Sequence, residues 1–259
     1  MKKYNYNLIL GVDSESTPVV WHWEQNNALA LIGKGGSGKT TNAAYWMSQW
    51  ACQGVRFLLA DPHMEDKQSL YAYTEHLHEA LIMPCVKEND DILEYVRYIS
   101  ALGKQRMDTQ VDHFPLVLVI DEFTSFVITG DHTQAAATLL LNTVNQYRKV
   151  GIRVMLLGQT WGQAVRQVSG LRDAISSSVI HKSSINDAKK FVSFDATAKQ
   201  ANLLTPGKAY YEDEMIWIPR LTGTSKMVAQ KRVRSFNYTA IQDTLKVEIG
   251  TNERFLSDY

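Results

Sequence analysis

Residues 28–40 read ALALIGKGGSGKT, and this stretch decides the fold. The run Ala28–Ile32 is apolar throughout, which is typical of a strand buried on both faces of a parallel sheet. The next eight residues, Gly33–Thr40, fit the pattern G-x-x-x-x-G-K-[ST] without a mismatch. A strand, a glycine-rich loop and a helix in this order form a phosphate-binding loop, because the glycines let backbone N–H groups point at phosphate oxygens. A chance glycine turn is the alternative, and the flanking strand and helix disfavour it.

The motif predicts a role for each polar residue of the loop. Lys39 is expected to reach the β- and γ-phosphates as a catalytic cation, and the Thr40 hydroxyl to ligate Mg²⁺. The amino end of the following helix adds its dipole to the attraction for phosphate. The expected phosphate-binding residues are Gly33, Gly35, Gly36, Ser37, Gly38, Lys39, Thr40 and Thr41.

A second strand predicts the other half of a nucleotide site. Residues 116–120 are all apolar, and Asp121 and Glu122 follow them. In α/β folds, charges at the carboxyl end of a buried strand face the ligand crevice. Asp121 is expected to hold Mg²⁺ and Glu122 to act as the general base toward water. The alternative is a helix start with acidic first-turn residues, which is less favoured beside a complete phosphate loop. The chain has no N/T-K-x-D motif for guanine, which favours ATP.

Composition excludes several other classes of protein. The 259 residues contain 27 Lys+Arg and 27 Asp+Glu, so a chain-wide basic surface is ruled out while a local basic patch is not. Only two cysteines are present, Cys52 and Cys85, which excludes a disulfide framework and gives no zinc-site spacing. No apolar run approaches the roughly 18–20 residues of a membrane span. We therefore expect a cytoplasmic protein with no direct membrane span.

The pattern along the chain predicts an α/β fold, with a mostly parallel sheet flanked by helices. Strands are expected at residues 8–10, 19–23, 28–32, 55–60, 116–120 and 152–157, near Val179, and at 209–211 and 215–218. Helices are expected at residues 40–53, 64–80, 90–107 and 134–149, and a loop follows residue 157. Residues 1–221 are predicted to form the ATPase domain and residues 222–259 a C-terminal tail or appended helix.

Further motifs follow in a fixed order. Asp61-Pro62 ends a strand, Asp121-Glu122 ends the next, Arg148-x-x-Gly-Ile closes a helix, and Gln159 ends another strand. The segment LLTPGKAY at residues 203–210 precedes the last strands. This order resembles the FtsK–HerA group of hexameric DNA-pumping ATPases, and the layout is most similar to an FtsK motor core. The resemblance covers residues 10–218 and implies a RecA-like P-loop NTPase fold.

The resemblance also implies roles for residues outside the phosphate loop. Arg148 corresponds to an arginine finger that enters the neighbouring subunit's site; the alternative is a cation that complements a helix dipole. Gln159 corresponds to a γ-phosphate sensor, the alternative being a polar residue at a strand end. The segment 160–172 occupies the place of a pore loop, where Arg166 and Arg172 are expected to contact DNA phosphates. A surface loop with two solvated arginines is the alternative there.

The motifs predict an ATPase with Mg²⁺ as cofactor, and the resemblance implies a motor that forms a homo-oligomeric, hexameric ring and moves double-stranded DNA. The length fits a compact motor of a plasmid, an integrative element or a virus. Two other functions stay open. A protein-transport ATPase predicts stimulation by a protein partner, and a nucleotide-switched binding protein predicts slow hydrolysis without a response to DNA.

Overall fold

The computed structural model describes residues 6–109, 113–129 and 133–236. Within them, nine strands form one sheet in the order β2-β1-β9-β8-β7-β3-β6-β5-β4. The strands are β1 (Leu8–Val12), β2 (Pro18–Trp21), β3 (Ala28–Ile32), β4 (Arg56–Ala60), β5 (Leu116–Ile120), β6 (Ile152–Gly158), β7 (Ser177–Ile180), β8 (Lys208–Tyr211) and β9 (Glu214–Trp217).

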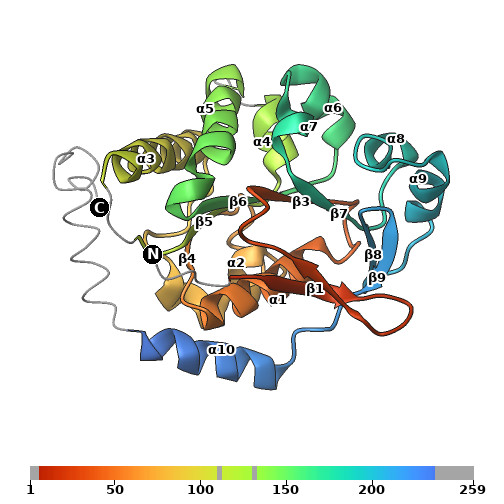
Figure 1. Ribbon diagram of the computed structural model, residues 1–259, viewed down its shortest axis with the longest axis horizontal. Coiled ribbons are helices and arrows are strands. Elements are labelled where there is room, and N and C mark those ends of the chain that lie inside the picture. Colours follow the sequence, from red (N-terminus) through yellow and green to blue (C-terminus); the bar gives the residue numbers. More distant parts are fainter. Residues whose placement is uncertain (1–5, 110–112, 130–132, 237–259) are drawn as a thin grey trace.

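Helices connect most of these strands and cover both faces of the sheet (Figure 1). The α-helices are α1 (Lys39–Cys52), α2 (Leu70–Tyr73), α3 (Asn89–Asp108), α4 (Phe123–Thr129), α5 (Thr133–Gln146), α6 (Trp161–Gln167), α7 (Leu171–Ala174), α8 (Ile185–Ala188), α9 (Asp195–Ala201) and α10 (Gly223–Ser235). Two 3₁₀ helices are η1 (Glu75–Ala80) and η2 (Tyr147–Val150).

The five strands β7-β3-β6-β5-β4 are parallel to their neighbours and form the centre of the sheet. Every residue of β3, β4, β5 and β6 is buried, as expected for strands covered on both faces. The strands β8, β9, β1 and β2 extend this sheet with antiparallel pairs. The predicted α/β fold with a mostly parallel sheet is therefore confirmed.

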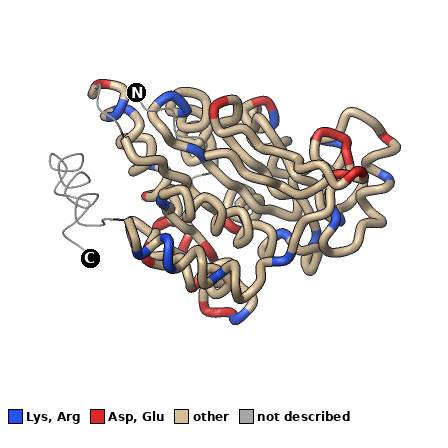
Figure 2. The backbone as a smooth tube through the Cα atoms, turned by 60° about the horizontal axis from the view of Figure 1, so that its bottom comes forward, with Lys and Arg blue, Asp and Glu red and all other residues tan. Residues whose placement is uncertain are grey.

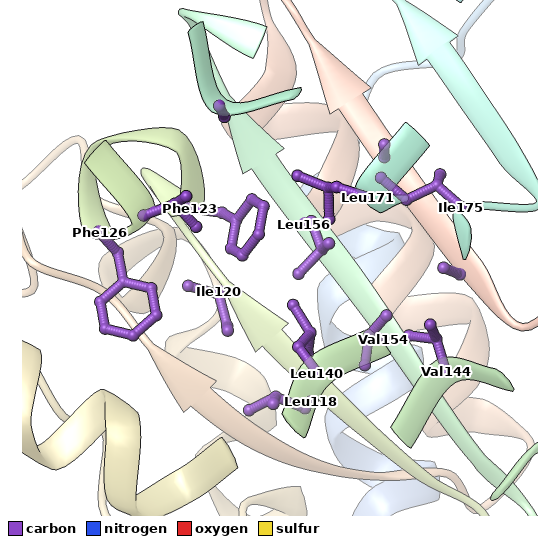
Figure 3. Close-up of a cluster of buried hydrophobic side chains, with 14 of the residues drawn as sticks. Leu118, Ile120, Phe123, Phe126, Leu140, Val144, Val154, Leu156, Leu171 and Ile175 are labelled. Atoms are coloured by element: carbon purple, nitrogen blue, oxygen red, sulfur yellow. The ribbon is translucent and has the colours of Figure 1, made fainter. Parts of the chain in front are cut away.

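Alternate residues along each central strand face two separate hydrophobic clusters. One cluster includes Ala30 and Leu118 and lies under α3, α4, α5, α6 and α7. The other includes Leu31 and Val119 and is covered by α1, η1 and α10. Figure 3 shows part of the first cluster, with side chains from α4, α5, β5 and β6 pointing toward one another. The labelled residues are Leu118, Ile120, Phe123, Phe126, Leu140, Val144, Val154, Leu156, Leu171 and Ile175.

Two predicted segments differ from the structure. Residues 64–80 contain turns, the four-residue α2 and the 3₁₀ helix η1 where a helix was expected, because the Asp61 carboxylate accepts the backbone N–H groups of His63 and Tyr71 and folds the chain back. The expected loop after residue 157 contains α6 and α7, which bury Trp161 and Leu171 against the core.

The C-terminal segment is described as far as Phe236. Residues 223–235 form α10, which buries Ala229 and Val233 in the cluster under α1. The rest of the predicted tail, residues 237–259, lies outside the described residues, and the boundary at 221 stays a prediction. Among the described residues, no helix has the length and apolar character needed to cross a membrane.

Candidate nucleotide-binding site

The phosphate loop lies at the carboxyl end of β3, and the backbone of two neighbouring strands holds it. The Gly33 N–H donates to the Gly158 carbonyl over 3.2 Å, and the Lys34 N–H to the Lys182 carbonyl over 2.8 Å. Gly36 and Gly38 have φ values of 70° and 97°, in the left-handed region that glycine enters without steric cost. The loop therefore has the backbone shape that its glycines predict.

The side chains of the loop fit a phosphate group. Lys39 is 6% exposed, and its Nζ donates to the Gly33 carbonyl at 2.7 Å and the Lys34 carbonyl at 3.2 Å. Burial lowers the pKa of Lys39, while Glu122 and Asp121 act in the opposite direction. The Ser37 hydroxyl is buried and has no hydrogen-bond partner among the described residues. A phosphate oxygen would satisfy this hydroxyl, which supports the fit.

The two carboxylates after β5 lie in different environments. Asp121 is buried, and its Oδ1 accepts the Glu122 backbone N–H at 2.9 Å. Burial raises the pKa of Asp121 to about 7, and the nearby Asp61 adds to the rise. Hydroxyl and carboxylate oxygens are ligands that Mg²⁺ accepts, so Thr40 and Asp121 fit the expected metal. Glu122 has a φ of 49°, a strained value for a non-glycine residue, of the kind that gathers at functional sites.

Gln159 joins the two halves of the site. The strand β6 lies between β3 and β5, so its carboxyl end places Gln159 between the phosphate loop and Glu122. The Gln159 Nε2 donates to Glu122 Oε1 at 2.7 Å, and its Oε1 accepts the Gly35 N–H at 3.1 Å. The structure thus places Lys39, Glu122 and Gln159 in one site, with one amide contacting both the loop and the carboxylate; their catalytic roles stay predictions.

Arg148 lies near the amino ends of the central strands, whereas this site lies at their carboxyl ends. It belongs to η2, just before the amino end of β6, and its Nη1 donates to the carbonyls of Glu24 and Gln25 at 3.0 and 2.8 Å. Residues 24–25 precede β3, and β3 runs parallel to β6. The guanidinium is therefore separated from its own phosphate loop by the length of these strands.

Arg153 positions this region, and the sequence analysis missed it. Its guanidinium is buried and donates to the Trp23 carbonyl at 2.7 and 3.2 Å and to the Arg148 carbonyl at 2.7 Å. It also lies over the Trp23 ring, 4.3 Å from the centroid. Burial lowers the pKa of Arg153 to about 9. An arginine within the otherwise apolar strand IRVMLLG was the available signal.

His181 supports the phosphate loop from behind and was also missed. Its N–H donates to the Ile32 carbonyl at 2.8 Å, and its ring Nε2 lies 2.9 Å from the Asn42 side-chain nitrogen. The ring is fully buried against the loop, where a Cβ on Gly33 would come within 2.9 Å of the His181 Cβ. Burial lowers the pKa of His181 to about 3, and Lys39 contributes to the decrease.

The two arginines predicted to contact DNA lie in different surroundings. Arg166 is exposed on α6. Arg172 on α7 is half-buried, because its Nε donates to the Lys190 carbonyl at 2.7 Å and its guanidinium lies 5.1 Å from the centroid of the Phe191 ring. Arg172 thus contacts neighbouring groups of the chain, whereas Arg166 is the more exposed of the two.

The fold and site define a P-loop ATPase. The family model of the poxvirus A32 protein matches residues 23–206, and the chain belongs to that family. The predicted resemblance to the FtsK–HerA group is confirmed by this match. No curated protein sequence matches the chain significantly.

Solved structures share the fold at low sequence identity. The cytoplasmic domain of the Thermomonospora curvata type VII secretion ATPase EccC superposes with a TM-score of 0.70 at 14% identity, over 92% of this chain and 32% of that one. The pCW3 conjugation coupling protein TcpA gives a TM-score of 0.71 at 13% identity, over 90% of this chain and 72% of that one. The genome packaging NTPase B204 of Sulfolobus turreted icosahedral virus 2 gives a TM-score of 0.50 at 11% identity, over 76% of this chain and 98% of that one. The chain thus spans about a third of the length of the EccC cytoplasmic domain.

Proposed function

We propose that this ATPase is a motor that forms a hexameric ring and moves double-stranded DNA through it. The observation that carries the proposal is the separation of Arg148 from the phosphate loop of its own chain. A second subunit that places the amino ends of its central strands against this site would bring its own Arg148 next to the γ-phosphate. DNA as the cargo is supported by the likeness to a conjugation coupling protein and to a genome packaging NTPase.

The residues of one chain supply most of the hydrolytic site. Lys39 and the loop amides bind the phosphates, and Glu122 accepts the proton of the attacking water. Gln159 holds the Glu122 carboxylate 2.7 Å from its amide nitrogen and contacts the loop at Gly35, so it senses whether a γ-phosphate is present. Thr40 and Asp121 would hold Mg²⁺, which when bound would neutralise part of the charge of the phosphates.

Protein transport is the second candidate function. The likeness to a type VII secretion ATPase favours it, and the overall charge of the chain favours neither cargo. A protein-transporting motor would use the same hydrolytic residues, so the two functions differ in what stimulates the reaction. Because the chain carries no net charge, DNA binding would have to come from a local surface, for which the exposed Arg166 is the candidate.

Steady-state ATP hydrolysis, measured at one fixed low salt concentration with and without long linear duplex DNA, tests the proposal. Fixed salt is required because phosphate contacts weaken steeply as salt rises. We expect duplex DNA to stimulate hydrolysis severalfold. Lys39→Ala and Glu122→Gln should abolish hydrolysis, whereas Lys231→Ala, on the outer surface of α10, should leave it unchanged. Hydrolysis that does not respond to DNA would refute DNA transport while leaving the ATPase intact.

A further inference from the structure

A cavity of about 380 Å³ adjoins the phosphate loop on the side of α1 and α10. Gly38 and Thr41 line it, so it begins where the loop passes into the first turn of α1. Its volume falls in the range of small-molecule sites. Its other walls come from Tyr73 at the end of α2, from Pro206 and Gly207 before β8, from Arg220 and Leu221 between β9 and α10, and from Lys226 in the first turn of α10.

We propose that this cavity takes the nucleoside half of the nucleotide, and that α10 and the segment before it form its outer wall. The inference rests on the proposed binding of ATP at the phosphate loop. When the β- and γ-phosphates lie near Lys39, the α-phosphate and the nucleoside must extend away from them along the first turn of α1. Thr41 is exposed there and lines the cavity, which gives the nucleoside a direct route into it.

The chemistry of the walls suits a base and a ribose. Tyr73, Pro206 and Leu221 supply apolar and aromatic surface for a flat ring. Arg220 and Lys226 supply cations that only donate hydrogen bonds, which suits ring nitrogens and ribose oxygens as acceptors. The Lys226 ammonium already lies over the Tyr73 ring, 5.9 Å from its centroid, so α10 reaches across the cavity to the α2 side.

The outer wall is attached to the rest of the molecule mainly through one face of α10. On α10, Ala229 and Val233 are buried, while Met227 and Val228 are 71% and 59% exposed. An ion pair of 2.8 Å between Arg234 and Glu79 joins α10 to η1. Figure 2 shows blue cationic segments along α10, close to the point where the described chain ends. The cationic helix thus docks on α1 and η1 through two buried side chains and a few polar contacts, next to the place where the nucleotide would lie.

Nucleotide binding and the docking of α10 should therefore stabilise each other, since each completes the same cavity. The family match ends at residue 206, so most of this wall lies beyond it. The residues of this wall should therefore determine how tightly, and how selectively, the nucleoside is held.

Calorimetric titration with two ligands, both in the presence of Mg²⁺, tests the inference. One is the non-hydrolysable ATP analogue AMP-PNP, and the other is inorganic tripolyphosphate, which lacks a nucleoside. Leu221→Trp fills the cavity, and Val233→Asp places a charge under α10 and undocks it. We expect each to weaken AMP-PNP binding about tenfold and to change tripolyphosphate affinity less than twofold. Met227→Asp, a matched charge on the exposed side of α10, should change neither affinity.

The inference is overturned if Leu221→Trp and Val233→Asp leave AMP-PNP affinity within twofold of the wild type, or lower both affinities equally. Its failure is distinguishable from failure of the proposed function. Lys39→Ala should weaken both ligands strongly, and a Lys39→Ala protein that binds both as the wild type does would refute the phosphate site itself.

Discussion

At the scale of single residues, the amide of Gln159 connects the phosphate loop to Glu122, the proposed general base. It donates to Glu122 and accepts from the Gly35 N–H, so removing it frees the carboxylate to rotate. We expect Gln159→Ala to lower kcat for ATP about 10- to 100-fold, because a general base contributes only when it is positioned. The KM should change less than threefold. Gln163→Ala, an exposed glutamine on α6, serves as the control, and a Gln159→Ala enzyme with wild-type kcat would contradict the assignment.

The buried imidazole of His181 predicts a pH dependence of stability. Its pKa in the folded protein is about 3, below the ordinary value of 6.5. Below pH 6.5 the unfolded chain therefore binds a proton that the folded chain refuses, so stability is fully present above pH 6.5 and falls as the pH drops toward 3. The loss approaches about 1.4 kcal/mol per pH unit.

Urea unfolding at pH 7.5 and 5.5 measures this effect. The decrease in the free energy of unfolding between these pH values should be about 1 kcal/mol smaller in His181→Gln than in the wild type. His22→Gln alters an exposed histidine, and it should keep the wild-type decrease. Equal decreases in all three proteins would show that His181 does not titrate as its burial requires.

Residues with local signals were predictable from sequence, and residues with long-range contacts were not. Asp121 follows β5 directly, and Lys39 ends the glycine-rich loop after β3, so a motif of a few residues places each of them. Arg153 and His181 work through partners 130 and 139 positions away in the chain, Trp23 and Asn42. No periodicity or spacing encodes such a contact, because it arises only when the sheet brings distant strands together.

At the scale of elements, the same distinction holds. The central strands are apolar runs buried on both faces, and their predicted positions agree with the structure within a few residues. The segment after β6 is rich in Gly, Ser and Gln, which favours a loop. It instead forms α6 and α7, because Trp161 is buried beside Phe123 and Phe191 and Asp187 accepts the Gly162 N–H at 2.7 Å. Tertiary contacts thus override weak local preference.

The helices α6 and α7 place Arg166 and Arg172 in different surroundings, although the sequence predicted the same role for both. Arg166→Ala should leave stability and basal hydrolysis unchanged, weaken duplex binding, and reduce the slope of log affinity against log salt by about one. Arg172→Ala removes the contacts to Lys190 and Phe191, so it should lower the melting temperature. Salt-dependent binding titrations and thermal melts check both expectations. If Arg172→Ala reduces the salt slope and Arg166→Ala does not, the roles of the two helices are reversed.

At the scale of the whole molecule, the parallel sheet places the nucleotide site and Arg148 at opposite ends of its strands. The phosphate loop, Glu122 and Gln159 lie at the carboxyl ends of the central strands, and Arg148 lies near the amino end of β6. In the proposed ring, a head-to-tail contact between copies would bring the amino ends of these strands in one copy against the phosphate loop of the next. Within this arrangement, each ATP site needs residues from two chains, and this requirement can be tested by mixing defects.

Co-expressed subunits that carry different defects provide that test. Arg148→Ala alone and Lys39→Ala alone should each lose hydrolysis, since an arginine finger contributes about 10³- to 10⁵-fold. In an equal mixture, an Arg148→Ala subunit keeps a complete phosphate loop and receives Arg148 from a Lys39→Ala neighbour, so about a quarter of the interfaces should be restored. A mixture of Lys39→Ala with Glu122→Gln is the control. Both residues serve the same site of the same chain, and no interface regains a complete set. Hydrolysis that returns in the first mixture and not in the control establishes that Arg148 acts between subunits. If neither mixture regains hydrolysis, Arg148 lies outside the site.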